Sequence, residues 1–135
     1  MDNNTLVPGF DDTKVDYLQI RLQDSAEVPK GLRVFLSGEL NTQNSPQFQR
    51  KIDLCISAGF TKLLFSCGSL SYMSSNGVGS FAYILKTLKE YDGRLCLFAV
   101  PPRVYEVLSL LGFATTGALS LPRRYSSASS ISVSQ

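Results

Sequence analysis

Residues 63–79, LLFSCGSLSYMSSNGVG, join a strand-like run to a helical pattern. The apolar run at its start is typical of a strand covered on both faces, and the small polar residues after it predict a turn. Three of them, Ser74, Ser75 and Asn76, stand where the helical pattern begins. A hydroxyl at a helix start can cap free backbone amides, bind an anion or accept a phosphate. Which of these roles the junction serves determines the function of the chain.

The chain before this stretch predicts a β-hairpin, a polar loop and a helix. In order, these are a strand at 17–22, a turn at 24–31, a strand at 32–36, a loop at 37–44 and a helix over about 46–58. Ser45 is expected to cap the helix, because the next residue, Pro46, loses no hydrogen bond in the first turn. Gly59 is expected to end it.

The chain after the junction continues the alternation of helices and strands. The predicted elements are a helix at 77–91, a strand at 95–100, a helix from Pro101 to Gly112 and a short strand at 118–121. Buried strands that alternate with amphipathic helices predict an α/β fold. We expect a mostly parallel central sheet of about five strands, with an antiparallel edge strand and three to four helices. Residues 1–14 are expected to form a flexible arm, 15–122 the domain and 123–135 a Ser-rich disordered tail.

Composition narrows the function classes. A net charge of +2 with scattered basic residues argues against nucleic acid and an anionic membrane surface, and the chain shows neither a membrane-spanning run nor a signal pattern. A cytoplasmic protein is therefore expected. The chain has no histidine, which disfavours an enzyme or a metal site, and we expect no cofactor. Cys55, Cys67 and Cys96 fall in apolar segments and are interpreted as reduced thiols of the core.

Two polar loops are candidates for a functional site. They span 37–44 and 67–76, and each follows a predicted strand and precedes a helix. Because ligand sites of parallel sheets gather at the carboxyl ends of the strands, we expect the two loops to meet at one edge. The helix starts there also offer unpaired amide donors.

Three stretches and the order of elements between them resemble one family. They are LSGELNTQNS at 36–45, LLFSCGSLSYMSSNGVGSF at 63–81 and GRLCLFAVPPRVYEVLSLLGF at 93–113. They resemble the STAS domain, which occurs in bacterial anti-sigma factor antagonists and in the cytoplasmic tails of sulfate transporters. The resemblance covers about residues 15–122.

The resemblance implies roles for the residues of the junction. The family pattern is Asp-Ser-Ser-Gly-Leu-Gly, and its first serine, the phosphoacceptor, corresponds to Ser75. An anti-sigma factor that is also a serine kinase would phosphorylate Ser75 with its own ATP, and phosphorylation would prevent binding. The unphosphorylated form would bind that kinase and release a sigma factor. The residues expected to line the partner-binding site are Asn41, Thr42, Ser74, Asn76, Gly77, Val78 and Gly79.

The chain departs from the family at three positions that are usually acidic. They are occupied by Asn41, Ser66 and Ser74. The acceptor hydroxyl is retained, but a carboxylate that would orient it or assist proton removal is missing. A neutral cluster would also tolerate a bound anion better than three aspartates.

Other interpretations of the same residues stay open at this stage. Ser74 and Ser75 would serve only as helix caps in a structural STAS subunit of a signalling scaffold or lipid-transport complex, with Gly77 and Gly79 allowing close packing. Alternatively, Asn41 and Ser74 would bind a small ligand or an anion. Tyr83 and Ile84 would either contact a partner or pack on the neighbouring helix, and the serine tail would be a further phosphorylated segment or a linker.

Overall fold

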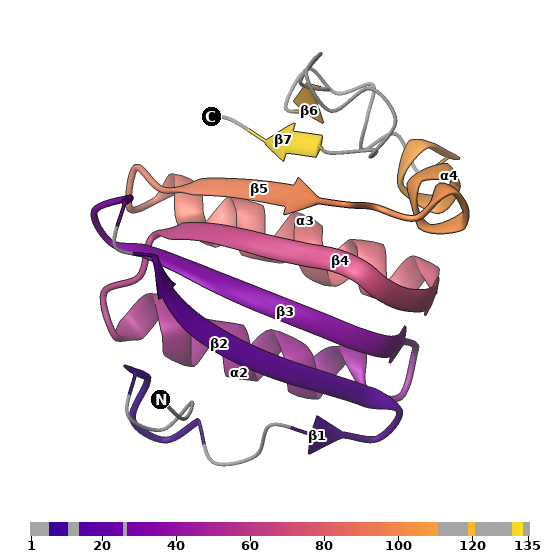
Figure 1. The fold of residues 1–135 in the computed structure, drawn as a ribbon, viewed down its shortest axis with the longest axis horizontal. Helices are drawn as coiled ribbons and strands as arrows, with labels where there is room; N and C mark the ends of the chain where they lie inside the picture. The colour runs from indigo at the N-terminus through magenta and orange to yellow at the C-terminus, as the bar shows by residue number, and fades with distance from the viewer. Residues whose placement is uncertain (1–5, 11–13, 26, 111–118, 121–130, 134–135) are drawn as a thin grey trace.

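The computed structural model describes residues 6–10, 14–25, 27–110, 119–120 and 131–133 (Figure 1). Its elements are β1 (Lys14–Val15), β2 (Leu18–Ser25), β3 (Gly31–Leu40), α2 (Ser45–Ser57), β4 (Lys62–Met73), α3 (Ser75–Lys89), β5 (Arg94–Phe98), α4 (Pro102–Leu110), β6 (Leu119–Ser120) and β7 (Ile131–Val133). Within this part of the chain the strands form one sheet of seven, in the order β1-β2-β3-β4-β5-β7-β6.

The central strands β3, β4 and β5 are parallel, and the flanking strands pair antiparallel. The predicted α/β class, with a mostly parallel centre and an antiparallel edge, is therefore confirmed. The sheet has more strands than expected because β1, β6 and β7 add two or three residues each at its edges. β7 lies inside the predicted tail at 123–135, so these three residues form a strand rather than a disordered segment.

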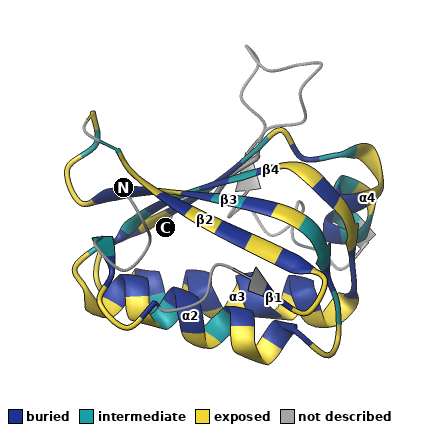
Figure 2. Cartoon of the chain, turned by 60° about the horizontal axis from the view of Figure 1, so that its bottom comes forward, coloured by how far each residue is buried: buried dark blue, intermediate teal, exposed yellow. Residues whose placement is uncertain are grey.

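The helices α2 and α3 cover one face of the sheet, and the core lies between them and the strands (Figure 2). Three fully buried phenylalanines form its centre. The centre of the Phe65 ring on β4 lies 6.1 Å from the ring centre of Phe48 on α2 and 5.0 Å from that of Phe81 on α3, and both pairs are edge-on. Such aromatic pairs add to the hydrophobic effect of burial and hold both helices against the same strand.

The cysteine prediction is confirmed for two of the three thiols. Cys55 and Cys67 are buried free thiols, and burial raises the pKa of each to about 12. Thiolates are thus disfavoured at both positions, as expected for side chains that fill a core. Cys96 is only half-buried.

The N-terminal segment is partly packed against the domain. Val7 and Phe10 are fully buried, although both fall in the stretch expected to be a flexible arm. The ammonium group of Lys51 on α2 lies 4.8 Å from the centre of the Phe10 ring, a cation–π contact that anchors this segment. At these positions the prediction of a loose arm is wrong, because it rested only on weak periodicity and turn-forming residues.

Two strands are longer than their sequence patterns predicted. β3 continues to Leu40 and β4 to Met73, through stretches expected to be loops. They stay paired past two register shifts, between Phe35 and Ser37 and between Gly38 and Glu39. Such bulges insert an extra residue and interrupt the alternation of buried and exposed side chains. The alternation of apolar and polar residues therefore ends before β3 and β4 do, and the sequence underestimates the length of both strands.

The start of α2 also differs from expectation. Ser45 is the first helical residue rather than the cap, and its hydroxyl donates to the Asn41 carbonyl oxygen at 2.5 Å. Asn44 occupies the cap position without a capping side-chain bond. The predicted stop is confirmed at Gly59, whose φ of +102° favours glycine.

Candidate functional site

The two polar loops meet at the carboxyl edge of the central strands, as expected. Leu40 and Met73 are register partners at the ends of β3 and β4, and the Ser74 amide donates to the Leu40 carbonyl oxygen at 2.9 Å. Across the same edge, the Thr42 hydroxyl donates to the Asn76 side-chain oxygen at 3.1 Å. The loop at 41–44 is thus fastened directly to the first turn of α3.

Ser74 is the cap of α3. Its backbone is extended, with φ −85° and ψ 170°, and its hydroxyl oxygen accepts a hydrogen bond from the Gly77 amide at 3.2 Å. The residue is buried. Its side chain therefore satisfies one of the free amide donors at the helix start.

Ser75 occupies a different environment, although it is the next residue. It is the first helical residue of α3, it is exposed, and its hydroxyl forms no hydrogen bond within the described part of the chain. The capping role and the proposed acceptor role thus fall on separate side chains. The interpretation of both serines as caps is wrong for Ser75.

The two glycines of the junction differ in their surroundings. A Cβ at Gly77 would lie 2.9 Å from both Leu40 Cγ and Met73 Cγ, so the absence of a side chain allows α3 to approach the strand ends. This confirms close packing at Gly77. A Cβ at Gly79 would meet nothing within 4 Å, so the packing role predicted for that residue is wrong.

Gly79 instead borders an open groove between the first turns of α2 and α3. The groove has a volume of about 510 Å³ and is lined by Ser45, Pro46, Gln49, Arg50, Ser75, Asn76, Gly79 and Ser80. The Ser80 hydroxyl donates to the Ser45 carbonyl oxygen at 3.4 Å and so connects the two helices beneath it. Among the described residues of this lining, Arg50 is the only charged one. The sequence patterns did not single out Gln49 and Arg50, because nothing local relates α2 to the junction.

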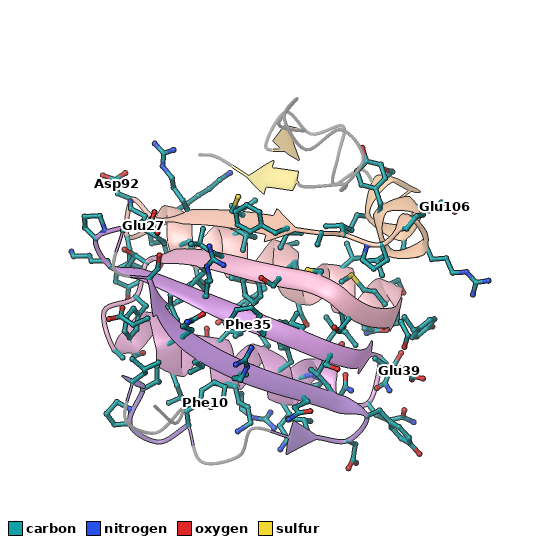
Figure 3. The ribbon with its side chains drawn as sticks, viewed as in Figure 1. Phe10, Glu27, Phe35, Glu39, Asp92 and Glu106 are labelled. Carbon is teal, nitrogen blue, oxygen red and sulfur yellow. The ribbon has the colours of Figure 1, made fainter. Side chains whose placement is uncertain are left out.

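Of the three positions that the resemblance marks as usually acidic, Ser66 lies apart from Asn41 and Ser74. The Asn41 side-chain oxygen accepts hydrogen bonds from the Gln43 and Asn44 amides, both at 3.0 Å, and so shapes its own loop. Ser66 lies between the inward-facing Phe65 and Cys67 of β4 and faces the other side of the sheet. There it borders a second depression, whose lining also includes Phe35 on β3. Figure 3 labels Phe35 on that strand.

The second candidate contact consists of Tyr83 and Ile84, and these two residues also differ in their surroundings. Ile84 is fully buried and belongs to the core, so its predicted packing role is the right one. Tyr83 is 41% exposed, and its hydroxyl donates to the Asp53 carboxylate on α2 at 3.5 Å. Partial burial raises the pKa of Asp53, and the hydrogen bond from Tyr83 opposes this shift.

Comparison with known protein families supports the fold described above. The family description "STAS domain" matches residues 17–121, which is most of the chain. The chain belongs to the STAS domain family. No helix in the described residues has both the length and the apolar character required to cross a bilayer.

Named relatives of this STAS domain are anti-sigma factor antagonists. It is 30% identical over 78 residues to BtrV of Bordetella bronchiseptica, named as a candidate anti-sigma factor antagonist, and the match covers 58% of this chain and 67% of BtrV. The anti-sigma-B factor antagonist of Listeria monocytogenes is 24% identical over 81 residues, or 60% of this chain and 71% of that protein.

Solved structures point to the same group. The anti-sigma factor antagonist SpoIIAA in its unphosphorylated form matches with a TM-score of 0.62 and 27% identity, covering 70% of this chain and 81% of the other. The phosphorylated form of SpoIIAA from Bacillus matches with a TM-score of 0.57 and 24% identity, covering 70% and 85%, and shows the fold alone.

Replacement of the two serines by alanine tests the division of roles. We expect Ser74→Ala to lower the free energy of unfolding by about 1 kcal/mol, because the Gly77 amide loses its acceptor. Ser75→Ala should change it by less than about 0.5 kcal/mol, as for an exposed side chain without partners. Urea denaturation of both variants measures the difference, and equal losses would contradict the assignment of the cap to Ser74.

The glycines provide a second matched pair. Both lie in α3, so alanine brings the same gain in helix propensity, about 1 kcal/mol. At Gly77 the added methyl group also meets Leu40 and Met73, and overpacking of this kind costs about 1–3 kcal/mol. Gly77→Ala should therefore be about 1–3 kcal/mol less stable than Gly79→Ala in urea denaturation. Equal stability of the two variants would show that α3 does not depend on this close approach.

Proposed function

We propose that this STAS domain is an anti-sigma factor antagonist that is switched by phosphorylation of Ser75. In its unphosphorylated form it binds an anti-sigma factor of the serine-kinase type, and that anti-sigma factor then releases its sigma factor. The observation that carries the proposal is the exposed Ser75 hydroxyl at the start of α3, which has no hydrogen-bond partner among the described residues, while the neighbouring Ser74 provides the cap. The antagonists among the named relatives support the same assignment.

The phosphorylation reaction requires only the hydroxyl from this chain. The Ser75 oxygen attacks the γ-phosphorus of ATP held by the kinase, and the bond from that phosphorus to the oxygen bridging it to the β-phosphorus breaks. ADP leaves, and the hydroxyl proton passes to a base of the kinase. The residue before the acceptor is Ser74, whose oxygen is already used as a cap, so this chain supplies no carboxylate at that position.

Phosphorylation would change the surface of the domain without refolding it. A phosphoserine carries about −1.5 to −2 charges near pH 7 and three acceptor oxygens. Negative charge at a helix N-terminus is favourable, and α3 has no acidic residue in its first turn to oppose it. The helix is therefore retained, and the effect falls on whatever protein docks at this edge.

The residues that a partner would touch are the exposed members of the predicted site. Thr42, Asn76 and Gly79 are exposed around Ser75. Gly77 and Val78 are buried and act by holding the start of α3 in place. The centre of the proposed contact surface thus consists of small, mostly polar residues. A phosphate on Ser75 would project from this surface and obstruct docking of the partner.

The proposal is tested with a serine-kinase anti-sigma factor from the same genome. Incubation with the kinase and ATP should place phosphate on Ser75, detected by mass spectrometry of the intact chain and its peptides. Ser75→Ala should abolish the modification and keep binding, whereas Ser75→Asp should weaken binding about tenfold or more, or about 1.4 kcal/mol. The equilibrium constant is measured by titration calorimetry.

Ser57→Ala is the matched control, because Ser57 is an exposed serine at the far end of α2. This variant should be phosphorylated by the kinase, and should bind it, to the same extent as the parent chain. Phosphate on a serine other than Ser75, or equal binding of the alanine and aspartate variants, would contradict the proposed switch.

A further inference from the structure

The groove beside Ser75 contains an unpaired cation. Arg50 lies on α2, is exposed and forms no ion pair with any described residue. It lines the same groove as Ser75, although the two residues lie on different helices and far apart in the sequence. A guanidinium group is well suited to bind a phosphate, since its N–H donors match two phosphate oxygens at once.

We propose that Arg50 binds the phosphate on Ser75 and holds it inside the groove between α2 and α3. This inference rests on the proposed phosphorylation of Ser75 and adds the residue that stabilises the phosphorylated state. Gly79 provides the necessary room, because its missing side chain leaves the wall of the groove open. The connection between Ser80 and Ser45 keeps the two helix starts together while the phosphate is bound.

Other charged groups around the groove do not compete for this role. On α2, Lys51 is buried against the Phe10 ring, and Asp53 accepts the hydrogen bond of Tyr83 one turn further along. Glu39 on β3 precedes the inward-facing Leu40 and therefore points to the other side of the sheet.

The remaining charged residues on α3 and α4 lie outside the lining of this groove. Arg103 and Glu106 on α4 border a separate depression together with Tyr72. Figure 3 labels Glu106 on α4. On α3 the basic residues Lys86 and Lys89 lie in the last turn, at the opposite end of the helix from Ser75. Arg50 is thus the cation that the described surroundings offer to a phosphate on Ser75.

The pairing predicts a shifted ionisation of the phosphate. Phosphoserine takes up its second proton with a pKa of about 6. A nearby guanidinium favours the dianion and lowers that pKa, and the positive end of the α3 dipole acts in the same direction. Because the phosphate pKa is depressed in the folded state, the dianion stabilises the fold above about pH 6. This contribution of the second negative charge is lost as the pH falls through the shifted pKa.

The experiment uses the full chain with phosphoserine incorporated genetically at position 75, so that no kinase is needed. Titration by ³¹P NMR should give a phosphate pKa below that of an unfolded phosphopeptide of the same sequence. Arg50→Gln should raise this pKa by about half a unit or more, and Arg50→Lys should restore part of the shift. The difference should shrink between about 0.1 M and about 1 M salt, where the screening length falls from about 10 Å to about 3 Å.

Arg103→Gln is the control, since it removes the same charge from an exposed position outside the groove. It should leave the phosphate pKa unchanged. An Arg50→Gln titration that coincides with the parent curve would overturn the proposal. An equal shift in Arg103→Gln would also overturn it, because the effect would then come from net charge rather than from a bound pair.

Thermal unfolding gives a second readout. Phosphorylation should raise the melting temperature more in the parent chain than in Arg50→Gln at pH 8, and the difference between the two increments should be smaller at pH 5, where the phosphate is mostly a monoanion. Identical increments at both pH values would contradict the pairing. Failure of a kinase to modify Ser75 would count against the proposed function, whereas these measurements concern the groove alone.

Discussion

The contact of Gly77 with the ends of β3 and β4 is the constraint on which the site depends. Leu40 and Met73 are paired at the last step of the sheet, and α3 begins directly above them. A helix can start so close to two large side chains only where it presents no Cβ. The hydrogen bond from the Ser74 amide to the Leu40 carbonyl oxygen then sets the direction of the chain as it leaves the strand. Together these contacts determine which of the neighbouring small residues is buried and which is exposed.

The division between Ser74 and Ser75 follows from that geometry. The side chain of the cap residue must turn back toward the helix amides, whereas the side chain of the first helical residue points outward. Two adjacent serines therefore have different surroundings. One is buried and bonded to Gly77, and the other is exposed, with no partner in the part of the chain that the structure describes. Stability and the proposed regulation are assigned to different hydroxyls. A domain of this kind can retain its fold whether or not the second serine carries a phosphate.

Parallel pairing of β3 with β4 accounts for the groove as well. The two crossovers place α2 and α3 on the same face of the sheet, with both helix starts at the carboxyl edge (Figures 1 and 2). Arg50 and Ser75 come to line one groove because their helices share this direction. The alternation of side chains along β4 also sets Ser66 apart from Asn41 and Ser74. Ser66 faces the side of the sheet away from the helices, while Asn41 folds the loop that precedes α2.

Much of the fold was predictable from the sequence, because hydrophobic periodicity and helix-stop residues such as Gly59 depend only on a few neighbouring residues. They were sufficient for the α/β class, the central strands, the three main helices and the meeting of the two polar loops. They did not predict the ends of β3 and β4, because bulges shift the register that periodicity depends on. Nor did they predict the burial of Val7 and Phe10, because contacts such as that of the Phe10 ring with Lys51 on α2 join distant parts of the sequence. The exact start of α3, which separates the roles of Ser74 and Ser75, was decided only by the tertiary structure, because the Ser74 amide bonds to Leu40 across the sheet edge. The open side of Gly79 and the place of Arg50 in the groove likewise depend on the packing of elements that are distant in the sequence.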